Sequence, residues 1–449
     1  MYLKNKRVLV LGLGVSGLST VKALHRLGAN IVVSDSKTKE ELKDFFDNTK
    51  DIYVEKHLNT NDIPLEDIDL IVKSPGIPPT APILLKAQLR NIEITTDIEL
   101  AYRISPTDRI ITITGTNGKT TTTALIGEIF KKADYNTYVA GNIGVGILWN
   151  MVNAEKEDVF VIEASSFQLE NTIYFKPRVS LITNITPDHL NWHGSLNNYI
   201  SAKKKIFKNQ DESDYTVLNY DDKTLREMEE EVNSNIIWFS VNHKLDNGVY
   251  IDGDYIVIKD GETIIKALPH KDLKIILENA LASIAVGWAM GIDVEIIAKV
   301  LSEFKGLEHR IEYVETIDEM SFYNDSKGTN PDSTIKAIEA INSPIILIAG
   351  GYDKGSEFDE LIKSFNGKVK DLILLGETKE KIKETALTCG FNNIHLVENM
   401  HEAVKLAYDL GQGKDNILLS PACASWDMYS NFEERGQDFK DAVYGLKED

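Results

Sequence analysis

The sequence has few cysteines and no long hydrophobic segment, and both absences limit what the protein can be. Among 449 residues only Cys389 and Cys423 are cysteines, too few for a disulfide framework, so we expect a reducing, cytoplasmic location. No uncharged apolar run reaches the length of about 18 residues that a membrane-spanning helix needs. The richest candidate runs only from Ala280 to Ile292. We therefore expect no membrane partner.

Basic residues are also scarce relative to acidic ones. The chain carries 49 Lys and Arg against 69 Asp and Glu, which gives a formal net charge of −20. A general nucleic-acid binder draws its affinity from basic surface, so we expect no nucleic-acid partner. Hydrophobic residues at 43% and charged residues at 26% are ordinary for a folded globular protein. Local groups must therefore hold any anionic ligand against the overall charge.

The order of hydrophobic runs predicts three α/β domains. Short apolar runs, typical of parallel strands covered on both faces, alternate with helical segments; the clearest runs are 7–11, 30–34, 70–73, 109–114, 159–162, 179–184, 345–349 and 417–420. We place the domains at 1–97, 98–306 and 307–449, with a linker at Lys305-Gly306-Leu307. The predicted fold is a Rossmann-like N-terminal domain, a central P-loop ATPase-like domain with a mostly parallel sheet, and a Rossmann-like C-terminal α/β domain.

The region 236–268 departs from this alternation, because short strands there follow one another around glycine-containing turns. Asp246-Asn247-Gly248 and Asp252-Gly253 are typical of hairpin turns. We predict a hairpin at each of these two places.

The strongest local signal is a glycine-containing loop within the run Thr-Ile-Thr-Gly-Thr-Asn-Gly-Lys-Thr-Thr at 112–121. A β-branched strand leads into this loop and a predicted helix leads out of it. Glycines let backbone N–H groups approach phosphate oxygens, and the new helix presents its positive end. Lys119 is then placed for the β and γ phosphates of a nucleotide, and the Thr120 hydroxyl for Mg²⁺. The common motif has an earlier glycine where this chain has Ile113, so the loop is a shorter variant. The alternative is an ordinary turn between strand and helix.

A second glycine-rich turn, Gly12-x-Gly14-x-x-Gly17, follows the first strand, and Asp35 ends the next strand. This arrangement matches the dinucleotide fingerprint, in which the acid binds a ribose hydroxyl. The same turn can hold any nucleotide diphosphate or simply allow close helix–strand packing. The motif by itself leaves open whether the ligand is NAD, another nucleotide or none.

Two polar residues of the central domain follow predicted strands. Glu163 comes directly after 159–162, and His189 comes shortly after 179–184. Open α/β sheets bind their ligands at the carboxyl ends of the strands. Together with a phosphate loop nearby, the two residues predict a site that could include a metal ion.

Lys203-Lys204-Lys205 lies in a predicted helix. Successive helical side chains point about 100° apart, so only one of the three can face a given pocket. A lysine with cationic neighbours has a lowered pKa, which leaves its amine more nucleophilic. The simpler interpretation is a solvated basic face, and the spacing does not decide between them.

Taken in order, these motifs resemble those of the Mur ligases, enzymes that add amino acids to the peptide of bacterial cell-wall precursors. The resemblance covers nearly the whole chain and rests on these runs: Thr114–Thr121, Gly141-Asn142-Ile143-Gly144, Glu163–Leu169, His189, His309-Arg310 and Asn324-Asp325-Ser326-Lys327. The runs Ser165–Glu170 and Ser420–Ser425 are characteristic of the members that add D-glutamate. The Asp-Asn-Pro-Arg run of the diaminopimelate-adding members is absent.

The resemblance implies a role for each matching residue. For the UDP-linked substrate the implied contacts are Val15, Ser16, Asp35, Ser36, Lys37, Ser74 and Asn142. For ATP they are Gly115, Thr116, Asn117, Gly118, Lys119, Thr120, Thr121, Asn279, Arg310 and Asp325. For D-glutamate they are Lys327, Thr329, Lys354, Ser425 and Phe432.

The implied catalytic residues are Lys119, Glu163, His189 and Lys203. Thr120, Glu163, His189 and a carbamylated Lys203 are the implied metal ligands. We choose Lys203 over Lys204 by alignment from Tyr199, four residues upstream. The chain departs from similar proteins at Ile275-Ile276, where they usually carry His-Asn, so part of the adenine pocket is expected to be rebuilt.

The implied activity is an ATP- and Mg²⁺-dependent ligase that adds D-glutamate to UDP-N-acetylmuramoyl-L-alanine through an acyl phosphate, acting as a monomer. Two alternatives remain among enzymes: a related Mur or folylpolyglutamate-type ligase with another amino acid, and an NAD-dependent oxidoreductase. A third alternative is a UDP-sugar sensor without catalysis.

Overall fold

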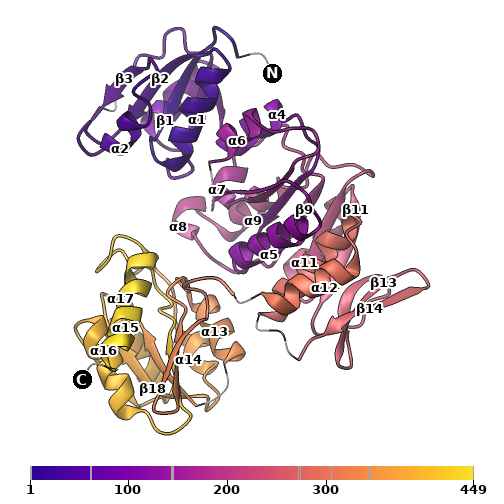
Figure 1. The fold of residues 1–449 in the computed structure, drawn as a ribbon. Coiled ribbons are helices and arrows are strands. Elements are labelled where there is room, and N and C mark those ends of the chain that lie inside the picture. The colour runs from indigo at the N-terminus through magenta and orange to yellow at the C-terminus, as the bar shows by residue number, and fades with distance from the viewer. Residues whose placement is uncertain are drawn as a thin grey trace. The chain divides into compact units, whose positions relative to one another are not determined.

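The computed structural model describes residues 3–60, 63–142, 146–271, 273, 275–304, 306–341 and 344–447. These residues divide into two compact units, Met1–Phe304 and Lys305–Asp449 (Figure 1). Three residues named from the sequence lie outside the described residues: Ile143, Gly144 and Lys305. Among the described helices, none combines the length and the apolar composition that a membrane crossing needs.

The first part of the larger unit is an α/β sheet with parallel strands. Its elements are β1 (Arg7–Leu11), α1 (Val15–Arg26), β2 (Asn30–Asp35), α2 (Lys43–Asp47), β3 (Glu55–Leu58), β4 (Leu70–Lys73), α3 (Pro82–Leu89), β5 (Glu93–Thr95) and α4 (Asp97–Ile104). The strand order is β3-β2-β1-β4-β5, and each neighbouring pair is parallel. The predicted Rossmann-like fold of the N-terminal part is therefore confirmed.

The second part of the same unit begins with β6. Its elements are β6 (Ile110–Thr114), α5 (Lys119–Lys132), β7 (Thr137–Gly141), α6 (Ile147–Val152), β8 (Val159–Glu163), α7 (Ser166–Leu169), β9 (Val179–Ile182), α8 (Leu190–His193), α9 (Leu196–Lys204), β10 (Tyr215–Asn219), α10 (Lys223–Arg226), a 3-10 turn (Glu229–Glu231), β11 (Asn235–Ser240), β12 (Gly248–Asp252), β13 (Tyr255–Asp260), β14 (Thr263–Pro269), α11 (Leu277–Ala289) and α12 (Val294–Glu303). The strand order is β14-β13-β12-β11-β10-β9-β6-β8-β7. Along this order, every neighbouring pair from β12-β11 to β8-β7 is parallel, whereas the β14-β13 and β13-β12 pairs are antiparallel.

One hairpin prediction is confirmed and the other is wrong. Asp252 pairs with Tyr255 across a tight antiparallel turn between β12 and β13, as predicted. The run Asp246-Asn247-Gly248 makes no hairpin, because β11 and β12 are parallel. Gly248 is needed for a different reason: a Cβ there would lie 2.2 Å from the Trp238 carbonyl oxygen. The glycine allows two parallel strands to approach and does not reverse the chain.

Hydrophobic side chains fix the layers of this unit. On one face of the central sheet, α5 and α11 enclose a core that includes Ile113, Leu125 and Leu281. On the other face, Phe160 belongs to a cluster that continues into the first sheet through Val72. Because this buried hydrophobic cluster is continuous between the two sheets, both belong to one compact unit.

The smaller unit contains its own α/β sheet. Its elements are β15 (Glu312–Ile317), β16 (Met320–Asn324), α13 (Pro331–Ala340), β17 (Ile345–Ala349), α14 (Asp359–Lys363), β18 (Val369–Leu374), α15 (Lys379–Thr388), β19 (Ile394–Leu396), α16 (Met400–Leu410), β20 (Asn416–Leu419) and α17 (Phe432–Gly445). The strand order is β15-β16-β20-β17-β18-β19. Strands β16, β20, β17, β18 and β19 are parallel to one another, while β15 is antiparallel to β16 at the edge.

Candidate active site

The predicted residues of the central sheet meet because they follow neighbouring strands. Strands β9, β6, β8 and β7 are adjacent and parallel, so their carboxyl ends share one edge of the sheet. His189, the phosphate loop and Asn142 follow β9, β6 and β7, respectively, and Glu163 is the last residue of β8. This is the edge at which open α/β sheets bind ligands.

The phosphate loop is held open by side chains that follow β9. The backbone N–H of Asn117 donates to Asn184 Oδ1 at 2.8 Å, and the Thr183 hydroxyl donates to the Asn117 carbonyl at 2.6 Å. Gly115 has φ 146°, and a Cβ on it would lie 1.9 Å from the Thr183 hydroxyl oxygen. Gly118, at φ 81°, is the residue that caps α5. Both glycines are therefore required by the loop's shape.

Lys119 begins α5 and folds back over the loop. Its Nζ donates to the carbonyl oxygens of Gly115 at 2.9 Å and Thr116 at 2.8 Å. Thr120 is half-buried and Thr121 is buried in the same first turn. The ammonium and the positive end of the helix thus lie beside backbone N–H groups, an arrangement that suits a polyphosphate.

Glu163 is a buried carboxylate with unused bonding capacity. Its Oε1 accepts from Asn142 Nδ2 at 3.0 Å, whereas its Oε2 is buried and has no hydrogen-bond partner within the described part of the chain. Asn142 lies close because Gly141 permits it: a Cβ on Gly141 would lie 2.3 Å from the Glu163 carbonyl oxygen. A buried carboxylate oxygen without a partner is costly, and a bound cation would satisfy it.

His189 stands in a strained conformation beside an aromatic ring. Its φ is 53°, which is uncommon for a residue other than glycine. Its ring lies 4.9 Å from the Phe167 ring, and its Nε2 lies 3.5 Å from Asp188 Oδ2. The carboxylate and the ring together fix the direction of the imidazole.

Lys203 and Lys204 differ completely in surroundings. Lys203 is 1% exposed, and its Nζ donates to the Gly115 carbonyl at 2.7 Å and lies 4.5 Å from the centre of the Tyr199 ring. Burial, reinforced by the nearby Lys119 ammonium, holds the pKa of Lys203 well below its usual range. Lys204 instead forms an ion pair with Glu231 on the outside of the helix. The geometry favours Lys203 as the lysine that faces the phosphate loop.

Asn279 reaches the same loop from α11. Its side chain is buried, and a Cβ on Gly118 would lie 2.4 Å from its Oδ1. Its Oδ1 accepts from the Thr122 hydroxyl at 3.3 Å, while its Nδ2 has no hydrogen-bond partner among the described residues. The unused donor leaves Asn279 able to bind a group of the nucleotide. Ile275 and Ile276 pack nearby in the hydrophobic core and at the helix start, respectively.

The donors at this edge fit magnesium. Across the described residues, no three His, Cys, Asp or Glu side chains form a ready-made metal cluster. Mg²⁺ is usually held by one or two carboxylates together with substrate phosphates and water, and needs no such cluster. The unpaired Oε2 of Glu163 is the observation that supports the fit.

The glycine-rich turn of the first sheet is built in the same way. It follows β1, while Asp35 ends β2 and Ser74 follows β4, and β2-β1-β4 are neighbours. The Asp35 carboxylate accepts from the backbone N–H groups of Leu13 at 2.7 Å and Lys37 at 3.0 Å. One carboxylate oxygen therefore orders the glycine-rich turn, and the other orders the loop that follows β2.

The remaining N-terminal candidates surround this turn. The Ser16 hydroxyl hydrogen-bonds the fully buried Asp97, whose pKa is raised by burial. Val15, Ser36 and Lys37 are exposed. The exposed N–H groups at the start of α1 leave room for an anionic ligand.

The candidate amino-acid residues gather at one edge of the smaller unit's sheet. Lys327 and Thr329 follow β16, Ser425 follows β20 and Lys354 follows β17, and these three strands are neighbours. The Lys327 ammonium lies 5.2 Å from the centre of the Phe432 ring. The loops after β17 and β20 are joined by a bridge between Tyr352 and Ala424.

Arg310 and Asp325, both predicted to contact ATP, form a pair in this unit. Arg310 Nη1 lies 3.4 Å from Asp325 Oδ1, and Asp325 Oδ2 accepts from the Ser420 hydroxyl at 2.7 Å. Asp325 is fully buried, and burial raises the pKa of its carboxyl.

Sequence reasoning missed several residues that shape these sites. Asn184 and Thr183 hold the phosphate loop, Asp188 orients His189, and Tyr199 bonds the Thr116 hydroxyl at 3.0 Å. Asn184 and Asp188 follow the same strand as His189, so the rule that ligands bind at carboxyl ends could have found them. Tyr199 gives no such signal, because it lies within α9.

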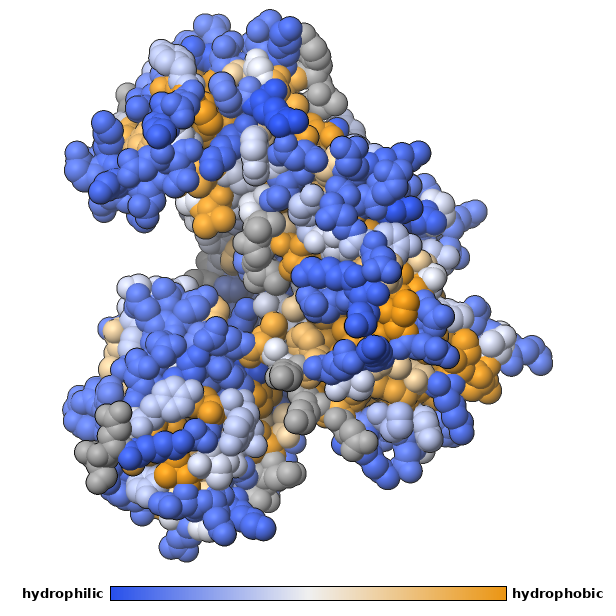
Figure 2. All heavy atoms as spheres, viewed as in Figure 1, coloured by the Kyte–Doolittle hydropathy of each residue, from blue (hydrophilic) through white to orange (hydrophobic). Residues whose placement is uncertain are grey.

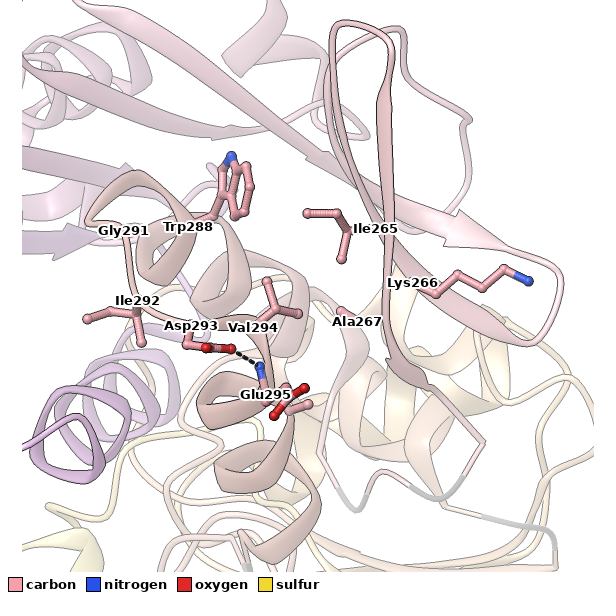
Figure 3. A pocket seen from close by; sticks show the side chains of 10 residues that line it. Ile265, Lys266, Ala267, Trp288, Gly291, Ile292, Asp293, Val294 and Glu295 are labelled. Carbon is pink, nitrogen blue, oxygen red and sulfur yellow. Dashed lines mark hydrogen bonds between the residues drawn. The ribbon is translucent and has the colours of Figure 1, made fainter.

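A pocket of about 860 Å³ lies elsewhere in the larger unit, between β14 and the turn that joins α11 to α12 (Figure 3). Trp288 and Ile265 face each other across it. Figure 2 shows hydrophobic residues on the surface near the β13–β14 hairpin, where Ile264 is 60% exposed. None of the predicted site residues lines this pocket.

Models of known protein families match most of the chain. A model described as Mur ligase MurD-like, N-terminal domain, matches residues 6–96. The model of the Mur ligase middle domain matches residues 113–287. The model described as Mur ligase, glutamate ligase domain, matches residues 309–423.

Two relatives match the chain from end to end. One, from Clostridioides difficile (strain 630), is named UDP-N-acetylmuramoylalanine--D-glutamate ligase; it is 48% identical over 452 residues, covering 100% of both chains. A relative of the same name from Alkaliphilus oremlandii (strain OhILAs) is 49% identical over 457 residues, again covering 100% of both chains.

Solved structures share the fold at much lower identity. UDP-N-acetylmuramate-alanine ligase from Thermotoga maritima matches with a TM-score of 0.60 and 20% identity, covering 98% of this chain and 99% of that chain. MurF ligase from Thermotoga maritima, solved in complex with ADP, matches with a TM-score of 0.60 and 16% identity, covering 99% of each chain.

Proposed function

The chain belongs to the Mur ligase family, and from this premise we propose that it uses ATP to join D-glutamate to UDP-N-acetylmuramoyl-L-alanine. It is an ATP-dependent amide-bond ligase of peptidoglycan precursor synthesis. The observation that carries the choice of substrates is the end-to-end similarity, at 48% and 49% identity, to relatives named for this reaction.

The chemistry explains why such a site is needed. A carboxylate is a poor electrophile, because attack adds negative charge to a group already charged. Transfer of the γ-phosphoryl group of ATP to the L-alanine carboxylate gives an acyl phosphate and ADP. The D-glutamate amine then attacks the acyl carbon, a tetrahedral intermediate forms, and phosphate leaves as the amide bond is made. Positioning and charge compensation are the protein's main contributions.

We assign the phosphate loop to ATP. Its backbone N–H groups and the start of α5 bind the phosphates, and the Lys119 ammonium, now on carbonyl oxygens of the loop, turns to the β and γ phosphates. Gly115, Thr116, Asn117, Gly118 and Thr121 complete the loop. Asn279, Arg310 and Asp325 are assigned to the same nucleotide.

We assign a first Mg²⁺ to Thr120 and Glu163, and a second to His189 and a carbamylated Lys203. Bound Mg²⁺ supplies positive charge that offsets the negative charge of the phosphates and of the acyl phosphate. Carbamylation fits the surroundings of Lys203: a neutral amine attacks CO₂, an N–C bond forms, and a proton is released. A buried cationic side chain thereby becomes an anionic ligand.

The other substrates are assigned to the two remaining loop clusters. Val15, Ser16, Asp35, Ser36, Lys37, Ser74 and Asn142 are assigned to the UDP-linked substrate. Lys327, Thr329, Lys354, Ser425 and Phe432 are assigned to D-glutamate, where the two lysines match the two carboxylates of the amino acid. The domains are proposed to divide at 97 and 306.

We also propose that the enzyme works as a monomer in the cytoplasm. Its substrates are small molecules, and each loop cluster is assembled from this one chain. Cys389 and Cys423 are both free, in keeping with a reducing compartment.

The decisive experiment measures phosphate release and the mass of the product with ATP, UDP-N-acetylmuramoyl-L-alanine and D-glutamate, each omitted in turn. We expect turnover only when all three are present. Incorporation of L-alanine or L-glutamate in place of D-glutamate would instead identify a related ligase. Tight NADH binding with indifference to UDP-sugars would identify an oxidoreductase, and UDP binding without any phosphate release would identify a sensor.

A further inference from the structure

His309 has no role in the proposed reaction, yet it contacts residues from both of the smaller unit's proposed ligand clusters. It directly precedes Arg310, which is assigned to ATP. Its backbone carbonyl accepts from the N–H of Lys327 at 3.1 Å. Its ring lies edge-on to the Phe432 ring, with centroids 6.2 Å apart at 83°. Lys327 and Phe432 are assigned to D-glutamate.

The hydrogen bonds of Asn324 determine which nitrogen of His309 carries the proton. Asn324 Oδ1 accepts from the backbone N–H of Ser326 at 3.1 Å, so its Nδ2 is the atom that faces His309 Nδ1 at 2.9 Å. An amide nitrogen only donates, so Nδ1 accepts and the proton is on Nε2. His309 therefore receives a directed bond from the end of β16.

Burial keeps the His309 imidazole neutral, although most of the charged groups around it are acidic. Burial lowers the pKa of its imidazole. The charged groups that face it are Glu308, Glu312, Glu433 and Lys440, and its own backbone N–H donates to Glu312 Oε2 at 2.9 Å. A neutral ring is what the acceptor role of Nδ1 requires.

The backbone on both sides of Arg310 is in the left-handed region. His309 has φ 61° and Ile311 has φ 46°, and a β-branched residue rarely adopts such an angle. The loop therefore does not keep this shape by local preference and depends on its contacts. One of these is the bond from the Ile311 N–H to Asp325 Oδ1 at 3.3 Å.

Helix α17 closes the other side of His309 through a glycine. A Cβ on Gly436 would lie 2.3 Å from His309 Nδ1 and 3.1 Å from Asn324 Nδ2. Only glycine at this position lets the helix that begins with Phe432 pack directly on the imidazole. His309 is thus enclosed by β16, by α17 and by its own strained loop.

Resting on the proposed function, we propose that His309 is a positioning residue that couples the ATP-binding Arg310 to the D-glutamate-binding Lys327 and Phe432. It touches no substrate. Its Nδ1 and its ring hold the Arg310 loop, the Lys327 loop and the start of α17 in one arrangement, so ATP and D-glutamate recognition rise and fall together.

The test separates the two contacts of the ring. His309→Asn keeps an acceptor close to the position of Nδ1 but loses the ring, and His309→Phe keeps the ring but loses the acceptor. Gly436→Ala displaces His309 from the opposite side without changing it. His395→Phe is the matched control, because His395 lies in the same unit on β19 and pairs with Asp371.

For His309→Phe we expect the KM values for ATP and for D-glutamate to rise together by about tenfold, with the KM for the UDP-linked substrate unchanged. Gly436→Ala is expected to show the same pattern, His309→Asn a smaller version of it, and His395→Phe none. A rise in only one of the two KM values, an equal rise in all three, or a lower melting temperature with unchanged KM values would each overturn the proposal. If one variant fails to fold, the other two still decide. Failure of the proposed function is distinguishable, since the unaltered enzyme would then show no turnover with D-glutamate.

Discussion

The strands of the central sheet have polar residues at both their carboxyl ends and their amino ends. The two ends differ in whether the buried polar groups have hydrogen-bond or ion-pair partners. At the carboxyl ends, Glu163 Oε2 and Asn279 Nδ2 are buried without a hydrogen-bond partner in the described chain. The ionisable side chain of Lys203 is buried there as well. Each of these would cost free energy in a protein that binds nothing.

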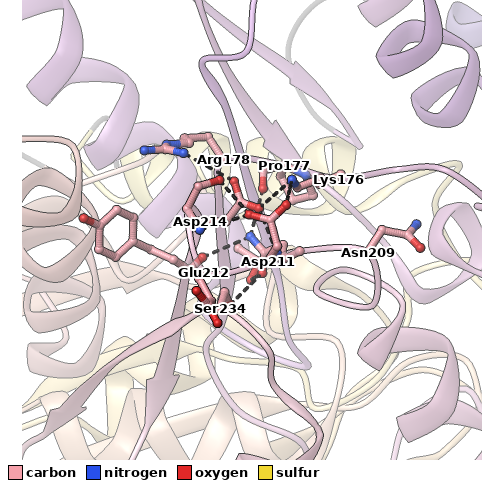
Figure 4. Close-up of polar contacts among 12 residues, drawn as sticks. Lys176, Pro177, Arg178, Asn209, Asp211, Glu212, Asp214 and Ser234 are labelled. Atoms are coloured by element: carbon pink, nitrogen blue, oxygen red, sulfur yellow. Dashed lines mark hydrogen bonds and ion pairs between the residues drawn. The ribbon is translucent and has the colours of Figure 1, made fainter.

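At the amino ends, just before β9 and β10, the polar groups satisfy one another (Figure 4). Lys176 pairs with Asp211 and, at 3.1 Å, with Asp214. Gln210 bonds the hydroxyls of Ser180 and Thr216 and the carbonyls of Pro177 and Tyr215. We infer that an edge whose polar groups all bond one another is structural. An edge with buried polar groups that lack hydrogen-bond partners binds ligands.

The proposed difference between the two edges would be contradicted most directly if Lys203 proved dispensable for activity. We expect Lys203→Ala to lower kcat/KM by about 10³-fold, because an anionic ligand for the metal is lost, and short-chain carboxylic acids to restore part of the activity. Lys204→Ala is the matched control and should stay within about twofold, since its ion pair with Glu231 is partly exposed. Phosphate-release kinetics decide; the opposite result would place the carbamate on Lys204.

Lys119→Ala tests the same edge through the nucleotide. We expect acyl-phosphate formation to fall by about 10²–10³-fold, because a preorganised positive charge at the phosphates is removed. Binding of the UDP-linked substrate, measured by calorimetry, should be nearly unchanged. Lost binding of both substrates would instead mean that Lys119 supports the fold of the loop.

Glu163→Gln removes the charge of the unpaired carboxylate while keeping its shape. We expect kcat to fall by about 10²-fold and the Mg²⁺ concentration for half-maximal rate to rise. Activity measured against Mg²⁺ concentration provides the check. An unchanged Mg²⁺ dependence would show that the unpaired oxygen serves something other than the metal.

Asp214→Asn makes the corresponding change at the amino ends. We expect no effect on any KM and a destabilisation of about 1 kcal/mol, since Lys176 and Arg178 lose a charged partner. Scanning calorimetry should show a melting temperature lower by about 2–4 °C. A change in kcat would contradict the view that this edge is structural.

The smallest expected effect is on acid stability. Hydrogen bonds from Lys176 and Ser213 lower the pKa of Asp211, so its carboxylate stabilises the fold above its unfolded pKa of about 3.9, and this contribution is lost as the pH falls toward the folded pKa. In Asp211→Asn that loss is absent. We therefore expect the difference in urea midpoint between the two proteins to shrink from pH 5 to pH 2; a constant difference would contradict it.

Much of the fold could be predicted from periodicity and glycines. The runs at 7–11, 70–73 and 345–349 are strands with the predicted bounds, because buried parallel strands need continuous apolar residues. Strands β3, β7, β15, β16 and β19 were not predicted, since none of these segments has a long continuous apolar run. The prediction of a hairpin at Asn247-Gly248 was wrong, because a close approach between parallel strands favours glycine just as a tight turn does.

The sequence by itself determined the set of loops. Glycines with positive φ, a lysine at a helix start and acids at strand ends are local features, and they do not depend on the rest of the fold. The tertiary structure decides which side chains lie opposite those loops. Three consecutive lysines have equal local preferences, and only the packing of α9 against the phosphate loop buries Lys203 at the Gly115 carbonyl while leaving Lys204 to Glu231. The strand order, set by contacts between distant segments, decided which residues share an edge and so which can act together.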